Sequence, residues 1–197
     1  GSRVGNDEAQ TRSRHGTVGD NMRRTMIFKS RWGWMAVVEA EKGIATIVLP
    51  KASRMMVAVD VRRGSRGQSE EGSSPRLRAA RKQLTEYLAG RRTSFTLPLD
   101  LSEGTGFQRR VWRALQNISY GHLHSYQELG ARVGGPQYAR AVGNAVGANP
   151  LPIVIPCHRI VSQDGSLGGF SGGLLAKRRL LALEGSLSRI CRRGRTS

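Results

Sequence analysis

Two short helices joined by a glycine turn constrain the fold of this chain more than any other feature. The first, over residues 125–134, begins with a capping box of Ser125 and Glu128 and ends at paired glycines, and the second starts at Pro136. A capping box satisfies free backbone N–H groups at a helix start, and glycine commonly ends a helix. The pattern therefore predicts a helix-turn-helix, although many helical hairpins share this outline.

The second of these helices has very few large side chains. Its small residues are Ala139, Ala141, Gly143, Ala145, Gly147 and Ala148. Each glycine costs a helix about 1 kcal/mol relative to alanine, so the pattern needs a reason. One reason is close packing against another helix. The other is close approach of the backbone to a bulky partner, such as a phosphate backbone or a narrow groove, with Arg140 as the long side chain that projects into it.

The first half of the chain predicts strands followed by a helix. Within residues 26–50, two β-rich runs flank a turn at Glu41-Lys42-Gly43, most simply as a hairpin. The polar, glycine- and serine-rich residues 62–75 predict a mobile loop. From Pro75 to Gly90 the spacing predicts a helix. Its apolar face consists of Leu77, Ala80, Leu84 and Leu88.

The formal net charge of +18 comes from 32 Lys and Arg residues against 14 Asp and Glu residues. A basic excess of this size has two explanations, a polyanionic partner or an arginine-rich genome composition. No apolar run approaches the roughly 18 residues of a membrane span, and no signal segment opens the chain. We therefore expect a cytoplasmic protein that binds nucleic acid and no membrane.

Chemistry points to the segment "PIVIPCHRIV", residues 152–161, where Cys157 follows an apolar run. A thiol reacts as its thiolate, so Cys157 needs a base or a lowered pKa. His158 is a poor direct partner, because adjacent side chains in an extended segment point to opposite faces. It can act through a water molecule if a carboxylate fixes its other ring nitrogen. The carboxylates that follow are Asp164, in a turn, and Glu184, which ends an apolar helical run.

A metal site is not expected from the cysteines and histidines. Cys157 and Cys191 have no metal-binding or disulfide-framework spacing, and both are interpreted as free thiols. His122 and His124 form a His-x-His pair with no third ligand nearby.

Four segments together, "SYQELG", "ARAVGNAVGAN", "NPLPIVIPCHRIV" and "GFSGGLLAKRRLLALEG", resemble the O6-alkylguanine-DNA alkyltransferases, or methylated-DNA–protein-cysteine methyltransferases. The resemblance is ordered from Phe107 to Gly185 and only general over residues 25–98. It implies an α/β fold class, with a small N-terminal α/β domain of ribonuclease H-like type before a mainly helical, winged helix-turn-helix C-terminal domain. We divide the chain into a disordered leader (1–24), an N-terminal α/β domain (25–98), a DNA-binding alkyl-acceptor domain (103–185) and a basic tail (186–197).

The resemblance also implies a reaction. Cys157 would take the alkyl group from O6-alkylguanine, and from O4-alkylthymine, in duplex DNA, irreversibly and once per molecule, with no cofactor. His158 would be the water-mediated base and Glu184 its orienting carboxylate. Asn149 would tie the second helix of the helix-turn-helix to the cysteine segment, and Tyr126 would crowd the neighbouring phosphate and help to protonate the leaving guanine.

Base and DNA contacts follow from the same matches. The target nucleotide must be flipped out of the stack, and Arg140 would take its place. Further DNA contacts are expected from Tyr126, Ala139, Gly143 and Ser125, in the minor groove and with little sequence dependence. The base pocket is expected to include Val154, Phe170, Ser171, Gly172 and Lys177. We expect a monomer in solution, located with the nucleoid, and leave cooperative assembly on DNA open.

Two departures and two alternatives accompany this interpretation. Phe170 stands where many family members have tyrosine, and residues 25–98 contain no cysteine or histidine for the zinc that some members carry. The main alternative is a non-catalytic winged-helix DNA-binding regulator or alkylation-damage sensor, in which Cys157 is only a buried small side chain. A cysteine hydrolase is the second, and it lacks a well-placed distant histidine.

Overall fold

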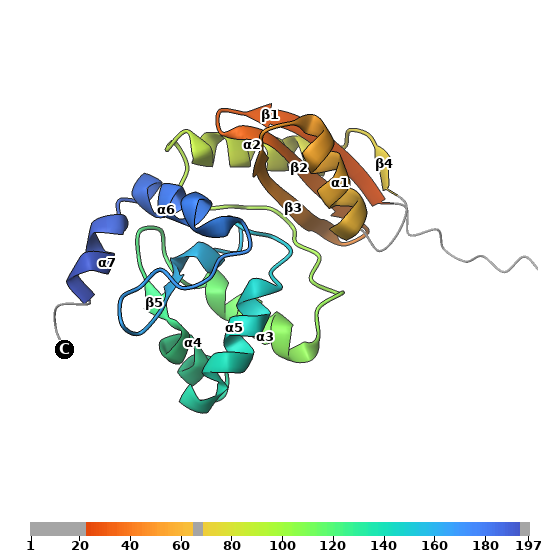
Figure 1. Cartoon of the computed structure of the whole chain (residues 1–197). Coiled ribbons are helices and arrows are strands. Elements are labelled where there is room, and N and C mark those ends of the chain that lie inside the picture. Colours follow the sequence, from red (N-terminus) through yellow and green to blue (C-terminus); the bar gives the residue numbers. More distant parts are fainter. Residues whose placement is uncertain (1–22, 65–68, 194–197) are drawn as a thin grey trace, which may run out of the picture.

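The computed structural model describes the backbone of residues 23–64 and 69–193, and Figure 1 shows two domains packed side by side. The first domain contains β1 (Arg23–Ser30), β2 (Gly33–Ala40), β3 (Gly43–Lys51), α1 (Arg54–Gly64), β4 (Ser69–Glu71) and α2 (Pro75–Leu88). The second contains α3 (Gly106–Gln116), β5 (His124–Ser125), α4 (Tyr126–Val133), η1 (Pro136–Tyr138), α5 (Ala139–Gly147), η2 (Cys157–Arg159), β6 (Ile160–Val161), α6 (Gly173–Leu183) and α7 (Leu187–Arg193).

The sheet of the first domain has the strand order β3-β2-β1-β4. Strands β1, β2 and β3 form an antiparallel meander, and β4 pairs in parallel with β1. The hairpin predicted around residues 41–43 is the β2–β3 connection. The β-rich run before it forms two strands rather than one, because the chain reverses at Arg31 and Trp32.

Both faces of this sheet are covered, and the alternation of residues along β2 explains how. Met35 and Val37 face the large core that includes the apolar side of α2, whereas Ala36 and Val38 pack with Val57 on α1. A strand that is buried on both faces appears in sequence as a continuous apolar run, which is what "MAVV" is. The predicted helix from Pro75 is confirmed as α2. It ends just before Gly90, which has a φ of 73°.

Two elements differ from the prediction of a loop over residues 62–75. The end of α1 extends to Gly64, and residues 69–71 form β4 against β1. Helix α1 carries little signal in the sequence, because its buried residues are only Val57 and Val61 and its first turn exposes Met55 and Met56. The strand β4 is the short polar sequence Ser-Glu-Glu, so its pairing comes from the backbone and leaves no hydrophobic pattern.

The helix-turn-helix of the second domain consists of α4, η1 and α5. The capping box predicted for Ser125 and Glu128 is confirmed, and α3 begins with a second one formed by Thr105 and Gln108. Helix α3 packs beneath α5, where the Trp112 indole N–H donates to the carbonyl oxygen of Ala145 at 2.8 Å. This contact fixes the inner face of α5 and leaves its other side toward solvent.

The segment between the domains joins them by backbone pairing. It lies along the free edge of β3, where the Ile44 N–H donates to the Pro98 carbonyl at 2.8 Å and the Asp100 N–H donates to the Ile44 carbonyl at 2.9 Å. The Ile47 N–H donates to the carbonyl of Pro150, in the second domain, at 2.9 Å. These bonds satisfy an otherwise open strand edge and place the two domains against one hydrophobic core.

The predicted terminal segments are described only in part. Strand β1 begins at Arg23, two residues inside the predicted leader, and residues 1–22 lie outside the described residues. Helix α7 lies within the predicted basic tail, with Ile190 buried. Among the helices of the described ranges, none combines the length and apolar character needed to span a membrane.

Gly43 provides a test of the domain junction. An added Cβ at this position would lie 2.3 Å from the Pro98 carbonyl oxygen, and its φ of 156° also disfavours a side chain. Gly43→Ala should lower the free energy of unfolding by about 2 kcal/mol, or ~4–8 °C in Tm. Gly72→Ala, where a Cβ meets nothing within 4 Å, is the control for thermal denaturation. Equal Tm values for the two variants would contradict this account of the junction.

Candidate active site

The loop before Cys157 is held in a strained conformation. Ile153 has a φ of 75°, which a β-branched residue rarely adopts, and its side chain is buried. Asn149 fixes this loop from the end of α5: its side-chain amide donates to the Ile155 carbonyl at 2.9 Å, and its side-chain oxygen accepts from the Leu151 N–H at 3.0 Å. Asn149 thus joins α5 to the cysteine segment, and the loop brings Cys157 to the start of η2.

The thiol of Cys157 is in its neutral form at rest. Its residue is 2% exposed, and burial raises the pKa of the thiol, while the hydrogen bond with Asn149 and the charge of Lys177 lower it by less. A neutral thiol must lose its proton before it can act as a nucleophile. The candidate to accept that proton is the next residue in the chain, His158.

His158 is fully buried and bound to a carboxylate. Its Nε2 lies 2.9 Å from Oε1 of Glu184, at the end of α6. Because an ionised carboxylate only accepts hydrogen bonds, we assign the proton of the neutral ring to Nε2, which leaves Nδ1 as the basic nitrogen. Nδ1 is buried and has no hydrogen-bond partner among the described residues. Burial lowers the pKa of His158 more than Glu184 raises it, so the ring is neutral at rest.

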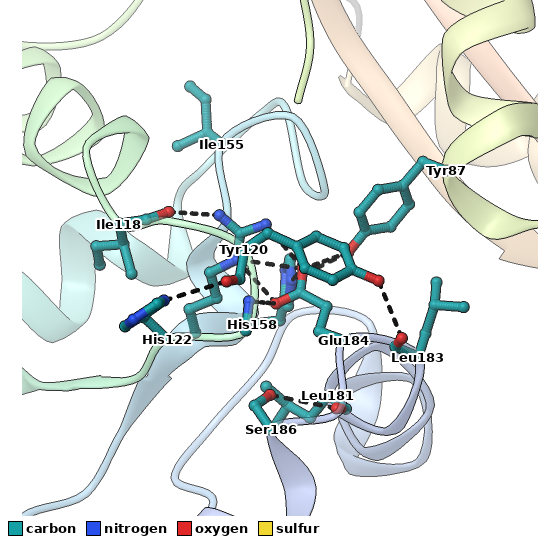
Figure 2. Close-up of polar contacts among 12 residues, drawn as sticks. Tyr87, Ile118, Tyr120, His122, Ile155, His158, Leu181, Leu183, Glu184 and Ser186 are labelled. Atoms are coloured by element: carbon teal, nitrogen blue, oxygen red, sulfur yellow. Dashed lines mark hydrogen bonds and ion pairs between the residues drawn. The ribbon is translucent and has the colours of Figure 1, made fainter. Parts of the chain in front are cut away.

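Glu184 collects donors from several parts of the chain, as Figure 2 shows. The guanidinium of Arg159 donates to both carboxylate oxygens, at 2.8 Å to Oε1 and 3.0 Å to Oε2. The hydroxyl of Tyr87 donates to Oε1 at 2.6 Å, and the Gly121 N–H donates to Oε2 at 3.2 Å. Burial would raise the pKa of Glu184, but the hydrogen bonds from His158 and Arg159 outweigh it and hold the pKa well below its usual value.

A cavity of about 170 Å³ opens beside the thiol. Its lining residues are Tyr126, Gly143, Val146, Gly147, Cys157, Gly169, Phe170 and Ser171. Phe170 and Ser171 are therefore the predicted base-pocket residues that line it. Val154 lines a separate cavity of about 660 Å³, between the interdomain segment and the second domain. Gly172 packs closely, since an added Cβ would lie 2.4 Å from Leu49 of β3.

Lys177 is buried behind the cavity. Its ammonium donates to the carbonyl oxygens of Ile160, Leu167 and Gly169, the last at 3.3 Å, so it ties the loop between β6 and α6 to β6. Burial lowers its pKa to about 8. The chain places this cation near the thiol, and its N–H groups are used by the loop backbone.

The outer face of α5 exposes its small residues. Arg140, Ala141, Asn144, Gly147 and Ala148 are exposed, while Ala145 packs on α3. A Cβ added at Gly147 would meet nothing within 4 Å. Packing against α3 explains why residue 145 is small. It does not explain the exposed small residues, which leave the backbone of α5 accessible to a binding partner.

Three further predicted site residues lie at the start of α4 and on α5, and of these only Tyr126 lines the cavity. The Tyr126 ring is half-buried, and burial raises its pKa, as does the negative charge of Cys157 when that thiol is ionised. Ala139 is half-buried at the first turn of α5. Ser125 is 1% exposed, and its hydroxyl accepts from the Glu128 N–H as the α4 cap.

Sequence reasoning missed two residues of this network, Arg159 and Tyr87. Arg159 could have been identified from the sequence, because it directly follows His158 in the "PCHR" segment. Tyr87 lies on the apolar face of α2, between Leu84 and Leu88, where nothing local distinguishes it from a core residue. Among the described residues, no group of three or more His, Cys, Asp or Glu side chains is arranged to hold a metal ion.

Comparison with known proteins covers both domains. Residues 22–101 match the sequence model of the 6-O-methylguanine DNA methyltransferase ribonuclease-like domain, and residues 106–186 match that of the DNA-binding domain. The structure of Mycobacterium tuberculosis OGT in complex with DNA superposes with a TM-score of 0.70 at 36% identity, over 84% of this chain and 94% of that one.

Relatives in sequence carry the same name. A methylated-DNA–protein-cysteine methyltransferase of Mycolicibacterium paratuberculosis is 54% identical over 103 residues, which are 52% of this chain and 62% of that protein. One of Methanosarcina acetivorans is 38% identical over 160 residues, 81% of this chain and 97% of that protein. With both domains matched and that relative covered almost throughout, the chain belongs to the 6-O-methylguanine DNA methyltransferase family.

Proposed function

We propose that this chain repairs DNA by moving the alkyl group from O6 of guanine, and from O4 of thymine, to the Sγ atom of Cys157. The observation that carries the proposal is a cysteine on a cavity of about 170 Å³ whose neighbour, His158, is bound to a buried carboxylate at 2.9 Å. A nucleophile on a small cavity, with an oriented base behind it, suits group transfer to sulfur. The names of the relatives support the same reaction.

The first step is removal of the thiol proton. It passes from Cys157 through a water molecule to Nδ1 of His158, the nitrogen that Glu184 leaves free. The charge of Glu184 stabilises the imidazolium that forms, in a site where burial strengthens the attraction. Cys157 and His158 are both neutral at rest, so the thiolate and the imidazolium form only when the alkyl group is in place.

The second step is in-line attack of the thiolate on the alkyl carbon. A carbon–sulfur bond forms and the carbon–oxygen bond breaks, with its electron pair remaining on guanine. The leaving guanine takes up one proton, which Tyr126 helps to deliver, and His158 releases to solvent the proton that it took from Cys157. The net result is the movement of one proton from the thiol to guanine. The thioether is stable and no step regenerates the thiol; each molecule therefore acts once, without a cofactor.

Duplex DNA is the proposed partner. A residue that is 2% exposed cannot reach O6 inside a base stack, so the target nucleotide must be flipped into the cavity. We infer that α5 enters the minor groove, where Ala139 and Gly143 permit close approach and Arg140 fills the vacated stack. Ser125 and Tyr126, at the start of α4, flank the phosphate beside it. The net charge of +18 supports binding that is salt-sensitive and independent of sequence.

The remaining assignments concern the flipped base and the setting. Phe170 forms an apolar wall, Ser171 and the backbone near Val154 and Gly172 contact the base, and Lys177 shapes the loop behind it. The protein is proposed to act as a monomer in the cytoplasm, at the nucleoid.

The reaction is tested by intact mass after incubation with duplex DNA that carries one O6-methylguanine. We expect one methyl increment per chain, mapped by peptide analysis to Cys157 and absent from Cys157→Ala. Cys191→Ala, which removes the other thiol, should still gain one methyl. Tight binding to the lesion with no mass change in the wild-type chain would contradict transfer and support a damage sensor.

Arg140→Ala tests the flipping assignment. Arg140 is exposed, so folding should change by less than about 0.5 kcal/mol, but transfer from duplex DNA should slow about tenfold or more, equivalent to ~1.4 kcal/mol. Transfer from a single strand should slow much less, because no stack has to be filled. Arg81→Ala, an exposed arginine on α2, is the matched control for lost charge. Equal slowing on duplex and single strand would rule out the role in the stack.

A further inference from the structure

Tyr87 brings the first domain into contact with the proton relay of the second. It lies on α2, is 0% exposed, and its hydroxyl donates to Oε1 of Glu184 at 2.6 Å. The hydroxyl oxygen of Tyr87 also lies 3.3 Å from Nε2 of His158. Figure 2 shows the ring reaching from its own helix toward the carboxylate. The network behind Cys157 is therefore completed by a side chain from outside the domain that carries the thiol.

The position of Tyr87 is fixed by packing. Its ring lies 5.4 Å from the ring of Phe95 and 6.1 Å from that of Tyr120, measured between centroids. A hydroxyl at this depth requires a partner, and here the partner is a charged acceptor. Burial and the charge of Glu184 raise the pKa of Tyr87 far above its usual value. The hydroxyl consequently remains a donor throughout the working pH range.

The charged and titratable groups around the hydrogen bond between Tyr87 and Glu184 determine how Tyr87 affects the carboxylate. Oε1 of Glu184 accepts from Tyr87, His158 and Arg159. Arg159 is charged and His158 becomes charged during the reaction, whereas Tyr87 stays neutral throughout, so Tyr87 orients the carboxylate and disperses part of its charge without adding a charge of its own. The other groups whose charge acts on this contact are Tyr120, from the segment before β5, and Lys177, from α6.

We propose that Tyr87 is a positioning residue for alkyl transfer, which holds Glu184 in place for His158 and so makes the first domain part of the relay. This inference rests on the proposed function. It gives the first domain a chemical role in addition to its packing. Tyr87 itself touches neither the cavity nor the reacting atoms among the contacts of the described residues.

Tyr87→Phe keeps the ring and removes the hydroxyl. We expect methyl transfer at neutral pH to slow about tenfold, because a misaligned base is less effective. The low-pH limb of the rate profile should also move to higher pH. With one donor fewer, Glu184 stabilises the protonated ring more strongly, so the pKa of His158 rises and the base is lost at a higher pH. The Kd for duplex DNA bearing the lesion should not change.

Tyr120→Phe is the matched control. It removes the neighbouring hydroxyl, which donates to the Leu183 carbonyl at 2.9 Å, and leaves every donor to Glu184 intact. Its rate profile should match the wild-type one. If Tyr87→Phe retains the wild-type rate and profile, or slows transfer only in proportion to lost folded protein, the inference is wrong. If the wild-type chain takes up no methyl, the proposed function fails instead.

A second variant covers the case in which Tyr87→Phe does not fold. Site-specific 3-fluorotyrosine at position 87 keeps the hydroxyl and makes it a stronger donor. Since burial keeps the phenol protonated, the low-pH limb should then move to lower pH, opposite to the shift in Tyr87→Phe. An unmoved limb with this variant overturns the inference.

Discussion

The buried carboxylate of Glu184 is the interaction on which the rest of the site depends. Isolated in the interior it would cost several kcal/mol, so it is stable only with its donors assembled around it. Those donors come from η2, from the turn at Gly121 and from α2 of the first domain. The end of α6, the cysteine segment and the first domain must therefore reach their positions together. The same donors hold His158 in the tautomer that leaves its Nδ1 basic.

Strain in the loop before Cys157 complements that network. Ile153 is held at a positive φ by its burial and by the two hydrogen bonds that the Asn149 side chain makes with the surrounding backbone, one as donor and one as acceptor. Because Asn149 lies only two residues beyond the end of α5, this helix and the segment that carries the thiol are linked as one unit. The position of a partner bound on α5 is thus fixed relative to Cys157, because no flexible segment lies between them.

Local patterns predicted the parts of this fold that local physics determines. The capping box at Ser125 and the helix from Pro75 follow from hydrogen bonding and periodicity within a few residues. Glu184 was a candidate because it ends an apolar helical run. The strand β4 and the contact of Tyr87 depend on pairing between distant segments, which leaves no periodic trace. The roles of individual residues toward DNA came from resemblance, since no local rule tells an exposed arginine such as Arg140 from its neighbours.

The most direct test of the central claim is urea unfolding of Glu184→Gln at pH 7, beside Glu86→Gln, whose carboxylate pairs with Arg92 nearer the surface. Breaking a buried ion pair should cost about 3–5 kcal/mol, whereas the control should lose about 1 kcal/mol or less. Because the pKa of Glu184 is lowered by folding, the wild-type advantage should be full at neutral pH and fall as the pH drops below about 4.3. A Glu184→Gln variant as stable as the wild-type chain at pH 7 would contradict the claim that this carboxylate organises the structure.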